Sequence, residues 1–199
     1  LLRSCRADFT AHGGYRWPSE VGGTCRPERW NPNPVCGDGL HGFLRGEGDA
    51  GLADWSERAQ WLVFSADVAD VVAIDTCKAK VAAARVEHVG KGETAGDRLR
   101  DCLKFMEDAG QLGQMAIGVV REGGDDSTLT GGARSTLTGG YGSTLTGGDG
   151  STLTGGDGST LTGGYGSTLT GGYGSTLTGG ARSTLTGGDG STLTGGYGS

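Results

Sequence analysis

One octapeptide repeated along the C-terminal part of the chain constrains the fold more than any other feature. From Ser127 to Gly198, nine copies read Ser-Thr-Leu-Thr-Gly-Gly followed by Tyr-Gly, Asp-Gly or Ala-Arg. A fixed short period indicates either that every copy adopts one local structure and stacks on its neighbours, or that the segment is a flexible low-complexity tail. The invariant leucine favours stacking, because a spacer has no reason to keep one apolar residue in phase.

The alternation within each copy predicts a strand. A period of two sends the leucine and the serine to one face and both threonines to the other. Gly-Gly and the next two residues supply the corners, because glycine turns tightly without steric conflict. Two octads then make one flattened 16-residue coil, and coils stacked about 4.8 Å apart satisfy each other's backbone groups. We therefore expect an all-β solenoid over residues 125–199.

Two sets of side chains define the predicted coil. The core is the leucine row, Leu129, Leu137, Leu145, Leu153, Leu161, Leu169, Leu177, Leu185 and Leu193. The outward residues are the threonine pairs Thr128, Thr130, Thr136, Thr138, Thr144, Thr146, Thr152, Thr154, Thr160, Thr162, Thr168, Thr170, Thr176, Thr178, Thr184, Thr186, Thr192 and Thr194. Threonine is β-branched and nearly fixed at χ1, so these rows are expected to form a stiff lattice that holds water in an ordered layer.

The octad closely resembles the repeat of bacterial ice-nucleation proteins, which reads Ala-Gly-Tyr-Gly-Ser-Thr-Leu-Thr or a near variant. Residues 140–146 differ from it mainly by Gly for Ala. The resemblance implies a β-solenoid whose Thr-x-Thr rows contact ice or ordered water, and it carries this role to the threonines above. Tyrosine occupies only some corners, so no unbroken tyrosine ladder is expected. Asp or Ala-Arg fills the others, either pairing Asp with Arg between coils or molecules, or forming solvated turns.

The size of the array limits what one chain can do. Nine octads give about four and a half coils, or about 22 Å at 4.8 Å per coil, which is a small template for starting a crystal. Ser199 begins a tenth copy, so we expect a longer native array. Nucleation would need that longer array or self-association, end to end or side by side, for which an uncapped coil offers an edge.

Three other interpretations of the repeat stay open. It resembles the calcium-binding β-roll nonapeptide, but each copy is one residue short and has Ser or Thr where that motif places an Asp ligand. A disordered, glycosylated spacer fits the glycine content. The main alternative function is a structural or adhesive filament, or a virion appendage, built on a self-assembling solenoid.

The composition changes near residues 122–124, where we place a domain boundary. Residues 1–124 hold every Trp, Cys, His, Phe, Met, Lys and Pro, and predict a small α+β globular domain that acts as a cap, anchor or assembly module. Apolar runs predict strands at 61–65, 71–75 and 78–89. Leucine spacing predicts a helix over 94–109, with Thr94 or Asp97 as its cap and Gly110 as its stop.

The stretch from Cys36 to Gly42, with the preceding Gly-Gly-Tyr-Arg-Trp-Pro, resembles a small domain of actinobacterial and phage proteins over residues 5–90. That resemblance implies no activity. Cys36 and His41 with Cys25 or His12 have loose zinc spacing, and Cys36, His41 and Glu47 are a conceivable catalytic set. We favour a glycine-rich turn in which His41 packs or hydrogen-bonds. The sequence thus predicts no catalytic residues, no metal and no cofactor.

Charge and hydropathy limit the binding partners and the cellular locations that the sequence predicts. The net charge of −6 and the absence of a basic face argue against nucleic acid and anionic membranes. The sequence contains no run long enough to span a bilayer, and residues 1–5 lack the apolar region of a secretion signal. Five cysteines without two-residue spacing indicate mostly reduced thiols. We expect a non-enzymatic protein, outside the cell, on its surface or on a virion rather than in the cytoplasm.

Overall fold

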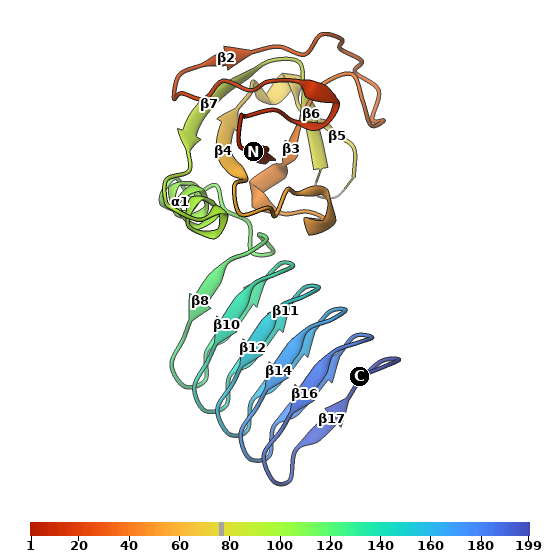
Figure 1. The fold of residues 1–199 in the computed structure, drawn as a ribbon. Helices are drawn as coiled ribbons and strands as arrows, with labels where there is room; N and C mark the ends of the chain where they lie inside the picture. The colour runs from red at the N-terminus through yellow and green to blue at the C-terminus, as the bar shows by residue number, and fades with distance from the viewer. Residues whose placement is uncertain (76–77) are drawn as a thin grey trace. The chain divides into compact units, whose positions relative to one another are not determined.

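The computed structural model describes residues 1–75 and 78–199, which form two compact units, Leu1–Gly113 and Gln114–Ser199 (Figure 1). The boundary expected after residue 124 follows composition, whereas the contacts divide the chain earlier. The reason is that residues 114–124 pair with the first octads rather than with the preceding unit.

The first unit is built on a seven-stranded sheet in the order β2-β7-β4-β1-β3-β6-β5, antiparallel throughout. Its strands are β1 (Leu2–Cys5), β2 (Thr24–Cys25), β3 (Leu40–Phe43), β4 (Gln60–Ser65), β5 (Val72–Ala73), β6 (Lys78–Val81) and β7 (Ala84–Val89). Short 3-10 turns occur at His12–Gly14, Leu44–Gly46, Ala50–Leu52 and Val68–Asp70. The sheet curves strongly around the N-terminus of the chain (Figure 1).

The structure refines the predicted strands. The run at 61–65 is a strand, β4, and it is fully buried from Trp61 to Phe64 apart from a small exposure of Val63. The run at 71–75 yields only the two residues of β5. The single strand expected over 78–89 is instead two strands, β6 and β7, because the chain turns at residues 82–83 and the two halves pair with different neighbours. Cys77 lies outside the described residues.

The predicted helix is confirmed as α1 (Ala95–Asp108). Thr94 is its N-cap: its hydroxyl accepts from the Asp97 N–H at 3.1 Å, and the Asp97 carboxylate accepts from the Thr94 N–H at 3.0 Å. This reciprocal capping box satisfies two backbone donors. Gly110 has φ +67° and donates to the Glu107 carbonyl, which ends the helix as expected. The buried face of α1 is Leu99, Cys102, Leu103 and Met106.

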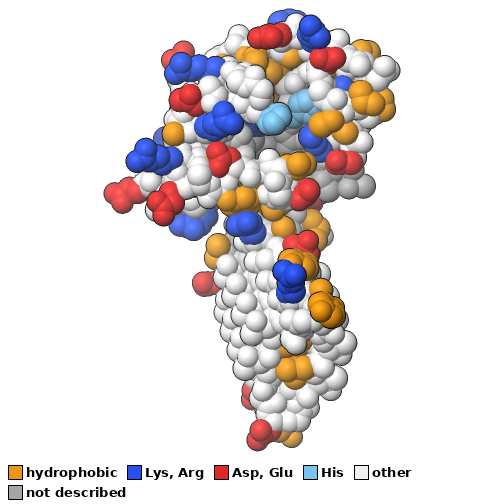
Figure 2. All heavy atoms as spheres, turned by 45° about the vertical axis from the view of Figure 1, so that its right-hand side comes forward, with side chains coloured by type: hydrophobic (Ala, Val, Ile, Leu, Met, Phe, Trp, Pro, Cys, Tyr) orange, Lys and Arg blue, Asp and Glu red, His pale blue; other side chains and the backbone are white. Residues whose placement is uncertain are grey.

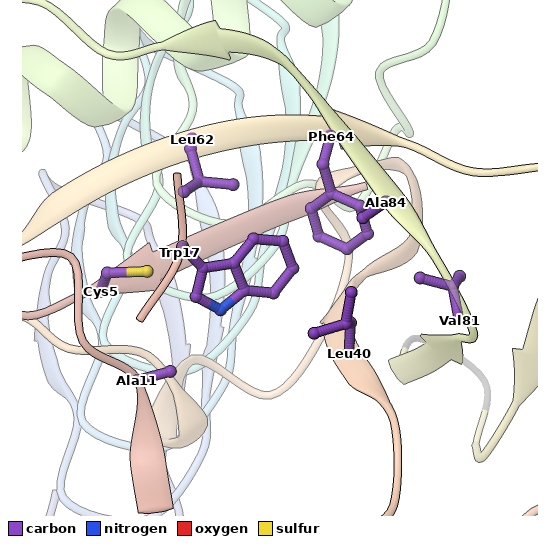
Figure 3. Packing of buried hydrophobic residues seen from close by; sticks show 8 residues of the cluster. All are labelled: Cys5, Ala11, Trp17, Leu40, Leu62, Phe64, Val81 and Ala84. Carbon is purple, nitrogen blue, oxygen red and sulfur yellow. The ribbon is translucent and has the colours of Figure 1, made fainter. Parts of the chain in front are cut away.

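A hydrophobic cluster centred on Trp17 fills the concave side of the sheet (Figure 3). The Trp17 and Phe64 ring centroids lie 4.9 Å apart, and both side chains are at most 2% exposed. The cluster is completed by Cys5, Ala11, Leu40, Leu62, Val81 and Ala84. Residues before β2 thus cover strands that come much later in the chain.

The second unit is the predicted β-solenoid with 16-residue coils and two octads per coil (Figure 1). One parallel sheet contains β8 (Val120–Glu122), β10 (Thr136–Thr138), β12 (Thr152–Thr154), β14 (Thr168–Thr170) and β16 (Thr184–Thr186). The other contains β9 (Thr128–Gly131), β11 (Thr144–Gly147), β13 (Thr160–Gly163), β15 (Thr176–Gly179) and β17 (Thr192–Thr194). We call these the even sheet and the odd sheet. In the part of the chain that the structure describes, no helix is long and apolar enough to cross a membrane.

Candidate functional site

The threonines of successive coils stand in register on both sheets. In the odd sheet Thr144 pairs with Thr128 on one side and with Thr160 on the other, and Thr146 is flanked in the same way. The even sheet repeats this arrangement from β10 to β16. Each sheet therefore carries two straight threonine rows, with neighbours about 4.8 Å apart along a row and about 6.6 Å apart along a strand.

These rows lie at the surface. Every octad threonine is exposed except Thr130 and Thr146, which are half-buried. No charged residue interrupts the rows between Thr128 and Thr194, so the faces present only hydroxyl and methyl groups. Figure 2 shows a solenoid surface with few charged or apolar side chains, which lie mainly along its margins. The result is a regular uncharged lattice on each side of the coil.

The leucines hold the two sheets together. Leu137, Leu145, Leu153, Leu161, Leu169 and Leu177 are completely buried. Toward the last coil the row opens, and Leu193 is 46% exposed. Because the leucines stand in register from one coil to the next on each sheet, the core is one continuous stack. Most of the stability must therefore come from contacts between neighbouring coils.

The serines of the octads lie beside the leucines and form hydrogen bonds, and all from Ser135 to Ser183 are buried. Ser159 Oγ lies 2.6 Å from the Gly156 carbonyl of its own coil and 3.3 Å from the Gly140 carbonyl of the coil before. Its single proton is thus shared between two corner carbonyls, each of which also accepts a backbone N–H from the next coil, so the hydroxyl is satisfied inside the coil. Similar bonds recur at Ser143, Ser151, Ser167, Ser175, Ser183 and Ser191.

The Gly-Gly pair is required by two different contacts. A Cβ on Gly155 would lie 2.6 Å from both heavy atoms of the Ser159 side chain, inside the coil. A Cβ on Gly156 would lie 2.8 Å from the backbone of the preceding coil at Gly140 and Tyr141. Real Cβ atoms do not approach this closely, so the first glycine admits the serine and the second allows the coils to stack at strand spacing.

The variable pair of each octad forms the corner, and its second residue has positive φ. Gly142, for example, has φ +65°. Arg134, Arg182 and Asp126 occupy the same position with φ between 55° and 60°. Its N–H donates to the carbonyl of the first corner residue of the next coil, as from Gly142 to Asp157 at 2.9 Å. This bond extends the backbone ladder around both edges.

The corners sort into two edges that differ in charge. The edge leading from even to odd strands carries Asp125, Asp126, Asp157 and Asp189 with Tyr141 and Tyr173, and we call it the acidic edge. The opposite edge carries Arg134, Asp149 and Arg182 with Tyr165 and Tyr197, and we call it the arginine edge. The two threonine faces thus lie between margins of unlike charge.

Aspartate and tyrosine in these corners are related by the coil period. The Asp125, Asp149 and Asp157 carboxylates each accept the backbone N–H of the tyrosine 16 residues later, all at 2.8 Å. On the arginine edge the Arg182 guanidinium lies over the Tyr165 ring, 5.9 Å from its centroid. A side chain in one coil therefore stabilises the corner of the next coil.

A degenerate octad that the sequence pattern did not reveal begins the solenoid. Residues 119–126 read Val-Val-Arg-Glu-Gly-Gly-Asp-Asp, and β8 pairs with β10 so that Arg121 stands opposite Leu137. The Arg121 guanidinium donates to the Gln114 and Thr130 carbonyls. Arg121 thereby covers the first end of the leucine stack with a hydrogen-bonding group. Counting back eight residues from the first intact copy, with Gly-Gly-Asp in phase, would have revealed it.

Cys36 and His41 of the first unit, singled out in the sequence, each form a hydrogen bond in the structure. Cys36 Sγ accepts from Lys78 Nζ at 2.9 Å, and His41 Nε2 accepts from the Gly37 N–H at 3.4 Å. Within the described residues no three His, Cys, Asp or Glu side chains are grouped so as to hold a metal ion. Cys5, Cys25, Cys36 and Cys102 are free thiols. His41 lies in strand β3, paired with Lys80, and not in the glycine-rich turn favoured from the sequence. Its ring does form a hydrogen bond, as expected, by accepting the Gly37 N–H.

The fold and its rows define a two-sheeted β-solenoid of tandem octapeptides. Comparison with known proteins finds similarity to bacterial ice nucleation proteins, and it covers the repeat region. Ice nucleation protein InaU of Pantoea ananas is 33% identical over 96 residues, which are 48% of this chain and 9% of that protein. An ice nucleation protein of Pseudomonas syringae pv. syringae is 59% identical over 91 residues, which are 45% of this chain and 7% of that protein.

The similarity thus covers only part of this chain and a small part of each relative. This chain spans less than a tenth of the length of the curated relatives that it matches. No protein-family model matches the chain, and no solved structure matches it.

Proposed function

We propose that the solenoid binds ice and orders water on its threonine rows. The observation that carries this proposal is the strict register of Thr-x-Thr between coils on both sheets. Each hydroxyl and methyl group is held by a β-branched side chain on a paired strand, so neither the spacing nor the rotamer varies freely. A stiff lattice can hold water molecules at fixed separations, whereas a mobile polar surface averages them out.

The repeat similarity supports the same function. The relatives are named for ice nucleation, and their match includes the octads that form this lattice. We propose the binding of ice for this chain and reserve nucleation for a larger template. The nine octads contribute five threonine strands to the odd sheet and four to the even sheet. At about 4.8 Å per coil the lattice is about 22 Å long, which is small for starting a crystal.

We also propose that nucleation by this array involves self-association. The acidic and arginine edges have complementary charges, so the margin of one chain suits the opposite margin of another. Side-by-side contact of this kind would place threonine faces next to each other and widen the lattice. Sedimentation velocity at low and high salt tests this point, because screening should weaken charge-driven association. Association that is absent at low salt, or unaffected by salt, would contradict it.

The central experiment substitutes threonines at matched positions and measures freezing. Thr146→Lys with Thr162→Lys disrupts the odd face, and Thr154→Lys with Thr170→Lys disrupts the even face. Tyr141→Lys with Tyr173→Lys places the same residues at two exposed corners of the acidic edge and serves as the control. Ice shaping, thermal hysteresis and droplet freezing temperature are measured on chains whose far-UV circular dichroism retains the strand signal.

We expect the Thr→Lys variants to reduce or abolish the effect on ice and the edge control to retain ice shaping. If a folded variant with both faces substituted shapes ice as the parent does, the assignment is wrong. Long fibres in negative-stain microscopy, without any effect on freezing, would instead favour the structural or adhesive filament.

A further inference from the structure

The first unit contains two adjoining cavities that share one wall. Their volumes are about 220 Å³ and 610 Å³. Both are lined by Arg3, His12, Asp38, Gly39 and His41, and Cys36 and Lys78 line the larger one. We call this combined space the basic cleft. Figure 2 shows a hollow bordered by histidine side chains on this unit. Its larger part is in the range of small-molecule binding sites.

Contacts of a buried lysine attach one wall of the cleft to the sheet. Lys80 is completely buried, and its Nζ donates to the Val35 carbonyl at 2.8 Å and the Gly37 carbonyl at 3.2 Å. The same ammonium lies 5.9 Å from the Trp30 ring centroid. These contacts attach the loop before β3 to the sheet. The walls are therefore formed before any ligand arrives, which lowers the entropic cost of binding.

Arg3 has unused hydrogen-bonding capacity in this wall. Its Nη1 donates to the His41 carbonyl at 2.9 Å, and its guanidinium lies over the Trp17 ring at 5.6 Å. Its Nε is buried and has no hydrogen-bond partner among the residues that the structure describes. A buried donor without an acceptor is unfavourable. A bound anion near this guanidinium would offset that cost through its attraction to the charge that Arg3 carries at the cleft wall.

The electrostatic environment favours an anion. The pKa of His41 is lowered to about 4, first by burial and then by the nearby charges of Lys78, Arg3 and Lys80. The imidazole is thus neutral at neutral pH, and the positive charge of the cleft comes from the lysines and Arg3. Asp38 lines both cavities, and Glu28 and Arg29 both line the smaller one. The excess of positive charge is therefore in the larger cavity, which Arg3 and Lys78 line.

The larger cavity also has an apolar part, formed by Leu2, Phe43 and Leu52 together with Gly42 and Gly51. A ligand that fills it would place an apolar group against these residues and its charge toward Arg3 and Lys78. We propose that the basic cleft binds a small organic carboxylate with a short aliphatic chain. This inference concerns the first unit and does not depend on the ice-binding proposal.

The test is an NMR titration of the full chain at pH 7 with hexanoate, acetate and inorganic phosphate. Hexanoate should shift the signals of Arg3, Gly39 and His41 and bind at least about tenfold more tightly than acetate, since each buried methylene adds affinity. It should also raise the pKa of His41, because a bound anion stabilises the imidazolium. Phosphate should bind more weakly than hexanoate, because it leaves the apolar part empty.

Lys78→Gln and Arg3→Gln should each weaken hexanoate binding by about tenfold or more, as expected for loss of a charged hydrogen bond. Lys78→Gln does not touch the Arg3–Trp17 contact, so it serves even if Arg3→Gln fails to fold. Arg6→Gln changes an exposed arginine outside the lining residues and is the matched control. Absence of hexanoate binding, equal binding of acetate or phosphate, or equal loss in Arg6→Gln would overturn the proposal.

Discussion

The leucine stack allows one substitution to be compared at two positions with the same local sequence. Leu153 in β12 is completely buried between Leu137 and Leu169 of the neighbouring coils, whereas Leu193 in β17 is 46% exposed. Both residues stand in Ser-Thr-Leu-Thr-Gly-Gly. Any difference between Leu153→Ala and Leu193→Ala therefore reports tertiary burial and not strand propensity.

The expected magnitudes follow from that burial. Truncating a fully buried leucine to alanine removes its transfer free energy and leaves a cavity, and together these lower the free energy of unfolding by about 2–5 kcal/mol. Coils above and below Leu153 cannot close this space without losing their own strand register, so we expect the upper half of that range. At Leu193 about half of the side chain already contacts water and no closed cavity forms, which leaves about 1 kcal/mol or less.

Denaturant unfolding followed by far-UV circular dichroism measures the total free energy of unfolding. Hydrogen exchange resolved by mass spectrometry locates the loss, because coils in a solenoid can open separately. Leu153→Ala should speed exchange in β10, β12 and β14, and Leu193→Ala should affect only the last coils. Equal losses at the two positions, or a loss below about 1 kcal/mol at Leu153, would refute a core built on stacked leucines.

Three further predictions concern the coil, its corners and the first unit. Gly156→Ala forces a Cβ to 2.8 Å from the backbone of the preceding coil and should destabilise the solenoid by about 1–3 kcal/mol in denaturant unfolding. Gly166→Asn is the control for the same assay and should be tolerated, because this corner has φ +64° and open space around it. Asp157→Ala removes the acceptor of the Tyr173 N–H and should lower stability by about 1 kcal/mol, with faster exchange at Tyr173 as the direct readout. Burial alone would raise the pKa of Asp101, but hydrogen bonds from His88 and the Lys91 N–H lower it below the usual 3.8. Its contribution is therefore present above about pH 4 and is lost as the pH falls further, so Asp101→Asn should flatten the acid limb of the thermal unfolding profile, and an unchanged limb would contradict this.

The octad by itself determined much of the solenoid. Its eight-residue period with one leucine predicted the coil length, the inward leucine row and the outward threonines, because alternation within a strand and glycine turns are local properties. The capping box at Thr94 and Asp97 is equally local, and α1 begins and ends where its residues indicate.

Only the tertiary structure decided which distant residues meet. The pairing of aspartate with the tyrosine of the next coil, the two edges of unlike charge and the place of Arg121 in the leucine row depend on stacking at 16-residue intervals. In the first unit, β1 lies between β3 and β4, and Arg3 meets His41 across the sheet. These contacts are made between segments far apart in the chain, where burial and hydrogen bonding override local preference, and no short-range pattern encodes them.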